Sequence, residues 1–317
     1  MAVAQYITKR FLFTVLVLWL VSVIVFGAVR LIPGDVCKIV LATSDVDERQ
    51  CQVIRHDLGL DRPAAVQYLH YMGGVLRGDF GKALISKRDV WGEIRTRIPL
   101  TLELALLATV FALALAIPIG VISAVKQDTP IDYLLRFLTI GWLSIPSFWL
   151  GTMLIVFPAR WWGYSPPVGY VDLWKDPLKN LHQLYLPAIA LGLALSASLA
   201  RLTRSSMLEV LRQDYIRTAR AKGLRERTMV FRHALRNALI PVITLFAIQF
   251  GVLLGGTVVL ESIFSLPGLG TLALNAVLLK DYPQVQGLVL FFATTLVLIN
   301  LVVDLSYAWI DPRIRYT

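Results

Sequence analysis

Long uncharged apolar runs alternate with polar connections along almost the whole chain. A helix needs about 17–25 predominantly apolar residues to cross the hydrocarbon core of a bilayer. Six runs meet this length: Phe11–Val29, Leu104–Val125, Phe137–Ala159, Gln183–Ala200, Asn237–Leu260 and Tyr282–Val303. The pattern predicts an all-α integral membrane protein with six transmembrane helices, which places both termini on the same side of the membrane.

The polar stretches between these runs predict the domain organisation. Residues 1–30 hold the N-terminus and the first transmembrane helix, and residues 31–99 form a small external region between helices 1 and 2. Residues 100–317 form a five-helix core that contains a basic loop at 201–236. From Arg30 to Pro99, eleven Lys/Arg face nine Asp/Glu, so the external region is interpreted as a surface for a soluble partner or as a solvated cap.

Charge predicts the orientation of the helices. The chain is 56% hydrophobic with a mean hydropathy of +0.66, yet its net charge is +10. The termini and the short connections on their side hold sixteen Lys/Arg, whereas the short connections on the other side hold four. Positive charge marks the cytoplasmic side of short loops, so both termini and the basic loop are expected in the cytoplasm. Because the charge is concentrated in one loop, it favours a topology signal, and no nucleic-acid partner is expected.

The basic loop has the pattern of a helix that ends at a glycine. Ser205 to Lys222 lacks Pro and Gly, which predicts one helix with an apolar stripe at Leu208, Leu211, Tyr215 and Ala219. Gly223 follows, and glycine allows the left-handed turn that ends many helices. Two interpretations stay open on these residues alone: the loop fixes topology only, or it is a mechanical contact for a partner protein.

Polar and small residues inside the spans are candidates for a solute pathway or for close helix packing. Gln249 lies near the middle of the fifth run, and it either faces a solute pathway or hydrogen-bonds a neighbouring helix. Gly251 and Gly255 have the GxxxG spacing that lets two helix backbones approach closely. Pro118 and Pro146 interrupt the second and third runs, where they predict kinks or hinges.

The two cysteines, Cys37 and Cys51, both lie in the external region. Thiols pair readily outside the cytoplasm, and closing a loop of this size contributes about 3 kcal/mol in the chain-entropy model. The two interpretations are a Cys37–Cys51 disulfide and two unrelated small apolar residues.

Catalytic and metal-binding patterns are absent from the sequence. The histidines have no metal-ligand spacing with each other or with the cysteines; they are His56, His70, His182 and His233. No phosphate-binding loop, nucleophile elbow or zinc-protease signature occurs. We therefore expect no catalytic residue, no metal site and no cofactor bound by this chain, and the energy for any active transport must come from another subunit.

Two strings in the basic loop resemble a known family. Tyr215–Gly223 reads YIRTARAKG, and Phe231–Pro241 reads FRHALRNALIP. They resemble the cytoplasmic "EAA" loop in the dipeptide/oligopeptide/nickel branch of ABC-importer permeases. Only Ala219, Gly223 and Leu235 match the general form of that loop strictly. Further strings resemble the family in the same order: Tyr6–Asp35, Leu58–Pro63, Gly78–Gly81, Arg97–Glu103, Ser144–Ser147, Glu261–Gly270 and Asp311–Arg315.

The resemblance implies the type I ABC-importer permease fold, with this chain as the first permease of a pair in the bacterial inner membrane. Its implied partners are a second homologous permease, two cytoplasmic ATPase subunits, an external solute-binding protein and membrane lipid. ATP and Mg would bind to the ATPase subunits, so the chain itself is not expected to be an enzyme. The residues implied to contact an ATPase subunit are Tyr215, Thr218, Ala219, Ala221, Gly223 and Leu224.

The resemblance also implies the cargo. Di- and oligopeptides are expected, delivered by the external binding protein, whereas nickel chelates, glutathione and sugars are the alternatives within the same type of importer. An alternative of another class is a free-standing channel or scaffold, in which the basic loop only sets topology.

Overall fold

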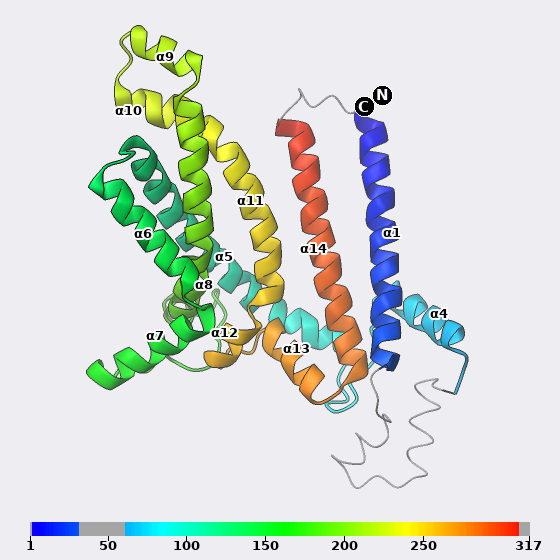
Figure 1. The fold of residues 1–317 in the computed structure, drawn as a ribbon. Helices are drawn as coiled ribbons and strands as arrows, with labels where there is room; N and C mark the ends of the chain where they lie inside the picture. The colour runs from blue at the N-terminus through cyan, green and yellow to red at the C-terminus, as the bar shows by residue number, and fades with distance from the viewer. Residues whose placement is uncertain (1, 32–60, 311–317) are drawn as a thin grey trace. The chain divides into compact units, whose positions relative to one another are not determined.

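The computed structural model describes residues 2–31 and 61–310, which form helices joined by short turns (Figure 1). Within these ranges, five helices are long and apolar enough to cross a membrane, or six if one bent pair counts as a single span. The chain divides into two compact units, Met1–Pro99 with Gly268–Thr317, and Leu100–Pro267. Helix α5 (Val90–Val125) contributes its first turns to one unit and the rest to the other. Cys37 and Cys51 lie outside the described residues.

The first unit is built on the two ends of the chain. Helix α1 (Ala2–Leu31) packs along α14 (Tyr282–Ile310), and the shorter helices are α4 (Ala64–Val75) and α13 (Leu269–Leu278). A hydrogen bond of 2.7 Å between Ser22 Oγ and Tyr68 Oη joins α1 to α4. The start of α5 lies against α14 so closely that a Cβ on Gly287 would come within 2.6 Å of Val90 Cγ1.

In the second unit, α5 and α8 (Pro177–Leu211) meet along a seam of small residues. Small buried residues recur at every fourth position of both helices: Ala108, Ala112, Ala116, Gly120 and Ala124 on α5, and Ala188, Gly192, Ser196 and Ala200 on α8. A Cβ on Gly192 would lie 2.7 Å from Ala108 O, and one on Gly120 would lie 2.5 Å from Thr203 Cβ. Small residues at this spacing let two helix backbones touch, so the seam is the centre of this unit.

The third predicted span is not one helix. Its residues divide between α6 (Pro130–Ser144) and α7 (Ser147–Trp162), which are bent by 95°. The break falls at Ile145, whose extended backbone (φ −85°, ψ 120°) is the conformation that a following proline imposes. Pro118, in contrast, lies inside α5 without ending it.

The helices of the basic loop also differ from the prediction. Helix α8 ends at Leu211 and a separate helix, α9 (Asp214–Ala221), follows after Gln213, which is extended (φ −72°, ψ 150°). The prediction of a single helix from Ser205 to Lys222 is therefore wrong. The chain then returns through α10 (Glu226–Thr228), the π-helix η1 (Met229–Ala234) and α11 (Leu235–Gly256), and the short α12 (Val258–Ile263) completes the unit.

Candidate functional site

The candidate site is the hairpin formed by α9, the turn at Gly223, α10 and η1, which we call the coupling hairpin (residues 214–234). In Figure 1 it lies at the end of the second unit where α8 finishes and α6 begins. Its surface is strongly basic, since five arginines and one lysine lie between Arg217 and Arg232. The hairpin thus presents a compact charged surface at one end of a membrane unit.

Burial of Ile216 explains why the helix breaks before α9. The Ile216 side chain is fully buried against Met207 and Val210 of α8 and Met229 and Val230 of η1. One continuous helix would carry residue 216 past this cluster, so tertiary packing overrides the local preference for helix. The predicted stripe through Tyr215 and Ala219 is consequently not the packed face of α9.

The turn at Gly223 has the geometry of a Schellman motif. The Gly223 N–H donates to Arg220 O at 3.0 Å, and the Leu224 N–H donates to Ala219 O at 3.3 Å. Gly223 has φ +79°, a left-handed conformation that glycine adopts without a side-chain penalty. The prediction that Gly223 ends this helix is confirmed.

The residues predicted to contact a partner lie together on α9 and its turn. Tyr215, Thr218, Ala221, Gly223 and Leu224 are exposed, and Ala219 is half-buried. Tyr215 is 40% exposed, yet its hydroxyl accepts a hydrogen bond of 2.7 Å from Asn237 Nδ2 on α11. Tyr215 therefore also ties α9 to the start of the returning helix.

Two exposed ion pairs lie on the coupling hairpin, Arg217–Asp214 at 3.4 Å and Arg220–Glu226 at 3.2 Å. All four side chains are more than half exposed. Solvent-exposed pairs typically contribute about 0–1 kcal/mol, so the apolar cluster around Ile216 fixes the hairpin more than these pairs do.

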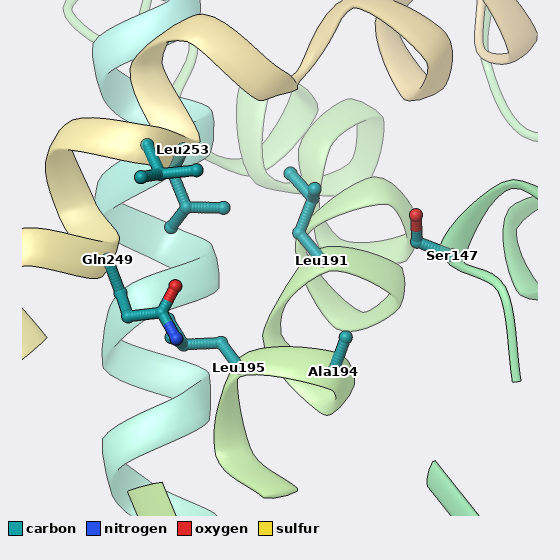
Figure 2. Close-up of a pocket in the computed structure, with 7 residues that line it drawn as sticks. Ser147, Leu191, Ala194, Leu195, Gln249 and Leu253 are labelled. Carbon is teal, nitrogen blue, oxygen red and sulfur yellow. The ribbon is translucent and has the colours of Figure 1, made fainter. Parts of the chain in front are cut away.

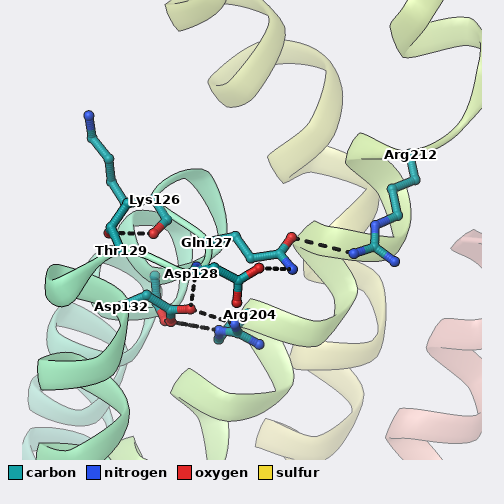
Figure 3. A network of polar contacts seen from close by, with 8 residues as sticks. Lys126, Gln127, Asp128, Thr129, Asp132, Arg204 and Arg212 are labelled. Atoms are coloured by element: carbon teal, nitrogen blue, oxygen red, sulfur yellow. Dashed lines mark hydrogen bonds and ion pairs between the residues drawn. The ribbon is translucent and has the colours of Figure 1, made fainter.

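A buried polar cluster lies at the turn between α5 and α6 (Figure 3). Asp132, in the first turn of α6, is fully buried and forms an ion pair of 2.7 Å with Arg204 of α8. Ser123 Oγ donates to the same carboxylate, and the Asp128 N–H donates to it at 3.1 Å. Asp132 and Arg204 are 72 residues apart, so no local sequence pattern predicts this cluster, and it is absent from the predicted site residues.

A cavity of about 240 Å³ lies between α7, α8 and α11. It is lined by Ser147, Leu191, Ala194, Leu195, Gln249, Val252 and Leu253. Figure 2 shows Gln249 and Ser147 on either side of the α8 residues. Neither polar side chain has a hydrogen-bond partner within the described part of the chain, which leaves both available to a solute or to another subunit.

Of the two glycines predicted to mark close packing, Gly251 is buried on α11, which packs along α8. Gly255 lies in the last turn of α11, among residues 254–256 whose side-chain surroundings lie outside the described part of the structure.

At the other end of the unit, polar side chains hold the connection between α7 and α8. Glu103 on α5 accepts hydrogen bonds from Tyr170 Oη at 3.0 Å and from Asn180 Nδ2 at 2.8 Å. Gln183 Oε1 accepts from the Val171 N–H at 2.9 Å. Burial, with the nearby Glu103 carboxylate, raises the pKa of Tyr170 above its usual value, so this phenol stays a neutral donor.

Several helices long and apolar enough to cross a membrane, with a basic hairpin at one end, define a multi-pass membrane protein. Two family models cover most of the sequence: the binding-protein-dependent transport system inner membrane component matches residues 116–316, and the N-terminal part of such a component matches residues 3–105. The chain belongs to this family of inner membrane transport components.

Curated relatives cover nearly the whole chain. It is 42% identical over 312 residues to the glutathione transport system permease protein GsiC of Escherichia coli K12, covering 98% of this chain and 99% of the relative. It is also 42% identical over 316 residues to the di/tripeptide transport system permease protein DppB of Pseudomonas aeruginosa, covering 93% and 94% respectively.

Solved structures share the fold. An inward-facing form of the MetNI methionine ABC transporter aligns with a TM-score of 0.56 and 18% identity over 69% of this chain and 96% of that chain. An amino acid ABC transporter aligns with a TM-score of 0.52 and 15% identity over 69% and 94%.

These comparisons confirm the expected ABC-importer permease, its type I fold and its multi-pass place in the inner membrane. The chain is a transport subunit rather than a catalytic one. Membership of this family argues against the alternative function, a free-standing channel or scaffold. The division into residues 1–30, 31–99 and 100–317 stays a prediction.

Proposed function

We propose that this chain forms part of the pathway by which short peptides enter the cell, driven by ATP hydrolysis in partner subunits. The observation that carries this proposal is the substrate shared by two relatives of equal identity, because glutathione is itself a tripeptide. Both relatives match over almost their full length, so substrate classes found elsewhere in the branch, such as nickel chelates and sugars, are less well supported.

The coupling hairpin is the proposed contact for an ATPase subunit. Its partner-facing residues would be Thr218, Ala221, Gly223 and Leu224, with Tyr215 and Ala219 at the edge of the contact. Exposure of these side chains and the fixed turn at Gly223 support this role. The basic charge favours a cytoplasmic position for the hairpin, and hence for both termini.

The remaining partners follow from the proposed assembly. A second, homologous permease would complete the pathway, two ATPase subunits would bind ATP and Mg, and an external solute-binding protein would deliver the peptide. The residues of this chain bind no cofactor in this scheme. The Cys37–Cys51 disulfide would lie on the external side, where the binding protein docks.

The cavity at Gln249 is the proposed pathway segment in this chain. Peptide bonds carry one hydrogen-bond donor and one acceptor, and the Gln249 amide together with the Ser147 hydroxyl offers both in an otherwise apolar lining. Gly251, two residues further along α11, would keep this helix close to its neighbour.

Uptake by the complete complex tests this function. The chain is produced with the second permease, both ATPase subunits and the binding protein, and uptake of a labelled dipeptide, a tripeptide, glutathione, nickel and a sugar is measured. Peptide uptake that requires ATP is expected. Uptake of nickel or sugar alone would refute the substrate class, and peptide uptake without the ATPase subunits would refute the coupling.

A further inference from the structure

Helix α6 packs along α8 but buries few of its side chains completely. Its two buried residues are Asp132 and Thr139, and the Thr139 hydroxyl donates only to Arg136 O of the same helix. Most of its large apolar side chains are exposed, including Tyr133, Leu134 and Phe137. Asp132 therefore supplies the buried polar contact from α6 to another helix in the part of the chain that the structure describes.

That contact has a fixed geometry. Arg204 Nη2 donates to Asp132 Oδ2 at 2.7 Å and Arg204 Nε donates to Oδ1 at 2.9 Å, so the pair is bidentate (Figure 3). Ser123 Oγ donates to Oδ1 and accepts from Arg204 Nε at 3.0 Å, which adds the end of α5 to the same cluster. Two parallel hydrogen bonds from a planar guanidinium hold direction as well as distance.

The same contact lies next to the coupling hairpin. Arg204 is on the last two turns of α8, which ends at Leu211, and α9 begins three residues later at Asp214. Arg212, between the two helices, donates to Gln127 Oε1 at 3.4 Å in the turn before α6. A displacement of α9 would therefore move the C-terminal end of α8, which is the end that carries the ion pair to α6.

We propose that the Asp132–Arg204 ion pair is a positioning link that carries movement of the coupling hairpin from α8 to α6. The proposal rests on the function proposed above, in which the hairpin docks an ATPase subunit. Apolar side chains can slide past one another with little change in energy, whereas a bidentate ion pair on a fully buried carboxylate holds one register. Ser123 fixes the end of α5 to the link, so that three helix ends move together.

The test measures peptide transported per ATP hydrolysed by the reconstituted complex in vesicles. Asp132→Asn keeps the shape of the side chain but leaves the Arg204 charge uncompensated. We expect the ratio to fall by about tenfold or more, because a broken buried pair loses its fixed geometry, while the ATPase subunits still copurify. Asp172→Asn is the matched control: it makes the same change in an exposed carboxylate of the connection between α7 and α8, where Asp172 pairs with Lys175, and the ratio should stay unchanged.

Two more variants distinguish an ion pair that transmits movement from one that only stabilises the fold. Arg204→Lys keeps the charge but removes the bidentate fork, so the ratio should fall to an intermediate value if geometry matters. If Asp132→Asn does not accumulate in the membrane, Ser123→Ala carries the test, because it removes the two hydrogen bonds of the Ser123 hydroxyl and leaves the ion pair in place. It should lower the ratio about twofold or more, because the cluster loses two charge-assisted hydrogen bonds.

Three results would overturn the link: an unchanged ratio in Asp132→Asn, an unchanged ratio in Ser123→Ala, or uptake and ATP hydrolysis that fall equally with the amount of protein in Arg204→Lys. Failure of the proposed function looks different. In that case the ATPase subunits would not copurify with the unaltered chain at all.

Discussion

The backbone at Gly223 gives the sharpest test of the coupling hairpin. Gly223 has φ +79°, and a Cβ placed on it would meet no other atom within 4 Å. A side chain there therefore costs only the left-handed backbone conformation, about 1–2 kcal/mol for an ordinary residue. That energy corresponds to a change of about 5–30-fold in the equilibrium between the formed and the unravelled turn.

A series of substitutions separates backbone strain from steric contact. Gly223→Asn should be the mildest, because asparagine tolerates the left-handed region, and Gly223→Ala should be intermediate. Gly223→Pro should abolish uptake, since proline fixes φ near −65° and removes the N–H that donates to Arg220 O. Gly223→Trp should also abolish uptake, by adding bulk to the partner-facing surface.

The assay is ATP-dependent peptide uptake, normalised to the amount of this chain in the membrane. Gly73→Ala is the control, because Gly73 has the same open surroundings within helix α4 and no positive φ. Equal uptake in all four Gly223 variants would refute the role of the turn. Normal uptake in Gly223→Ala with loss only in Gly223→Trp would show that the partner senses bulk at this position and that the left-handed backbone is not required.

Three further predictions follow from packing and from the cavity. Ile216→Ala should destabilise the coupling hairpin by about 2–5 kcal/mol, because the side chain is fully buried, and limited proteolysis at the hairpin should become faster. Gly192→Val should lower the thermal stability of the detergent-solubilised protein, since its Cβ would press on Ala108 O, a backbone atom that cannot turn away; unchanged stability would contradict the seam. Gln249→Leu should reduce peptide uptake by about 5–30-fold, the effect of losing about 1–2 kcal/mol of hydrogen bonding, without changing stability, and Val252→Leu in the same lining is its control.

The sequence predicts those features that depend on local pattern. Apolar runs were enough to place five of the six predicted spans, and the glycine at 223 was enough to predict a left-handed helix end. The third run divides between α6 and α7, a bend that the hydrophobic pattern does not show. The break between α8 and α9 was missed because it depends on Ile216 reaching Met229, a contact that no local preference encodes.

The polar links depend on residues that are distant in the chain. Asp132 and Arg204 are 72 residues apart, and their pairing follows from how α6 packs along α8. The seam between α5 and α8 was within reach, because small residues at every fourth position are visible in the sequence. Only the GxxxG pair at Gly251 and Gly255 was recognised, and the longer pattern was overlooked.

The break at Ile145 leaves α6 shorter than the hydrocarbon core of a bilayer is thick. The fit of this helix to the membrane should therefore depend on bilayer thickness. Helix α6 has 15 residues and so extends about 22 Å, against a hydrocarbon core of about 30 Å. Where lipid covers the exposed apolar side chains of α6, the bilayer would have to thin by up to about 8 Å, at a cost of fractions of a kcal/mol per Å. Vesicles made from lipids with shorter acyl chains would relieve this mismatch, so the choice of lipid should change the stability of the protein.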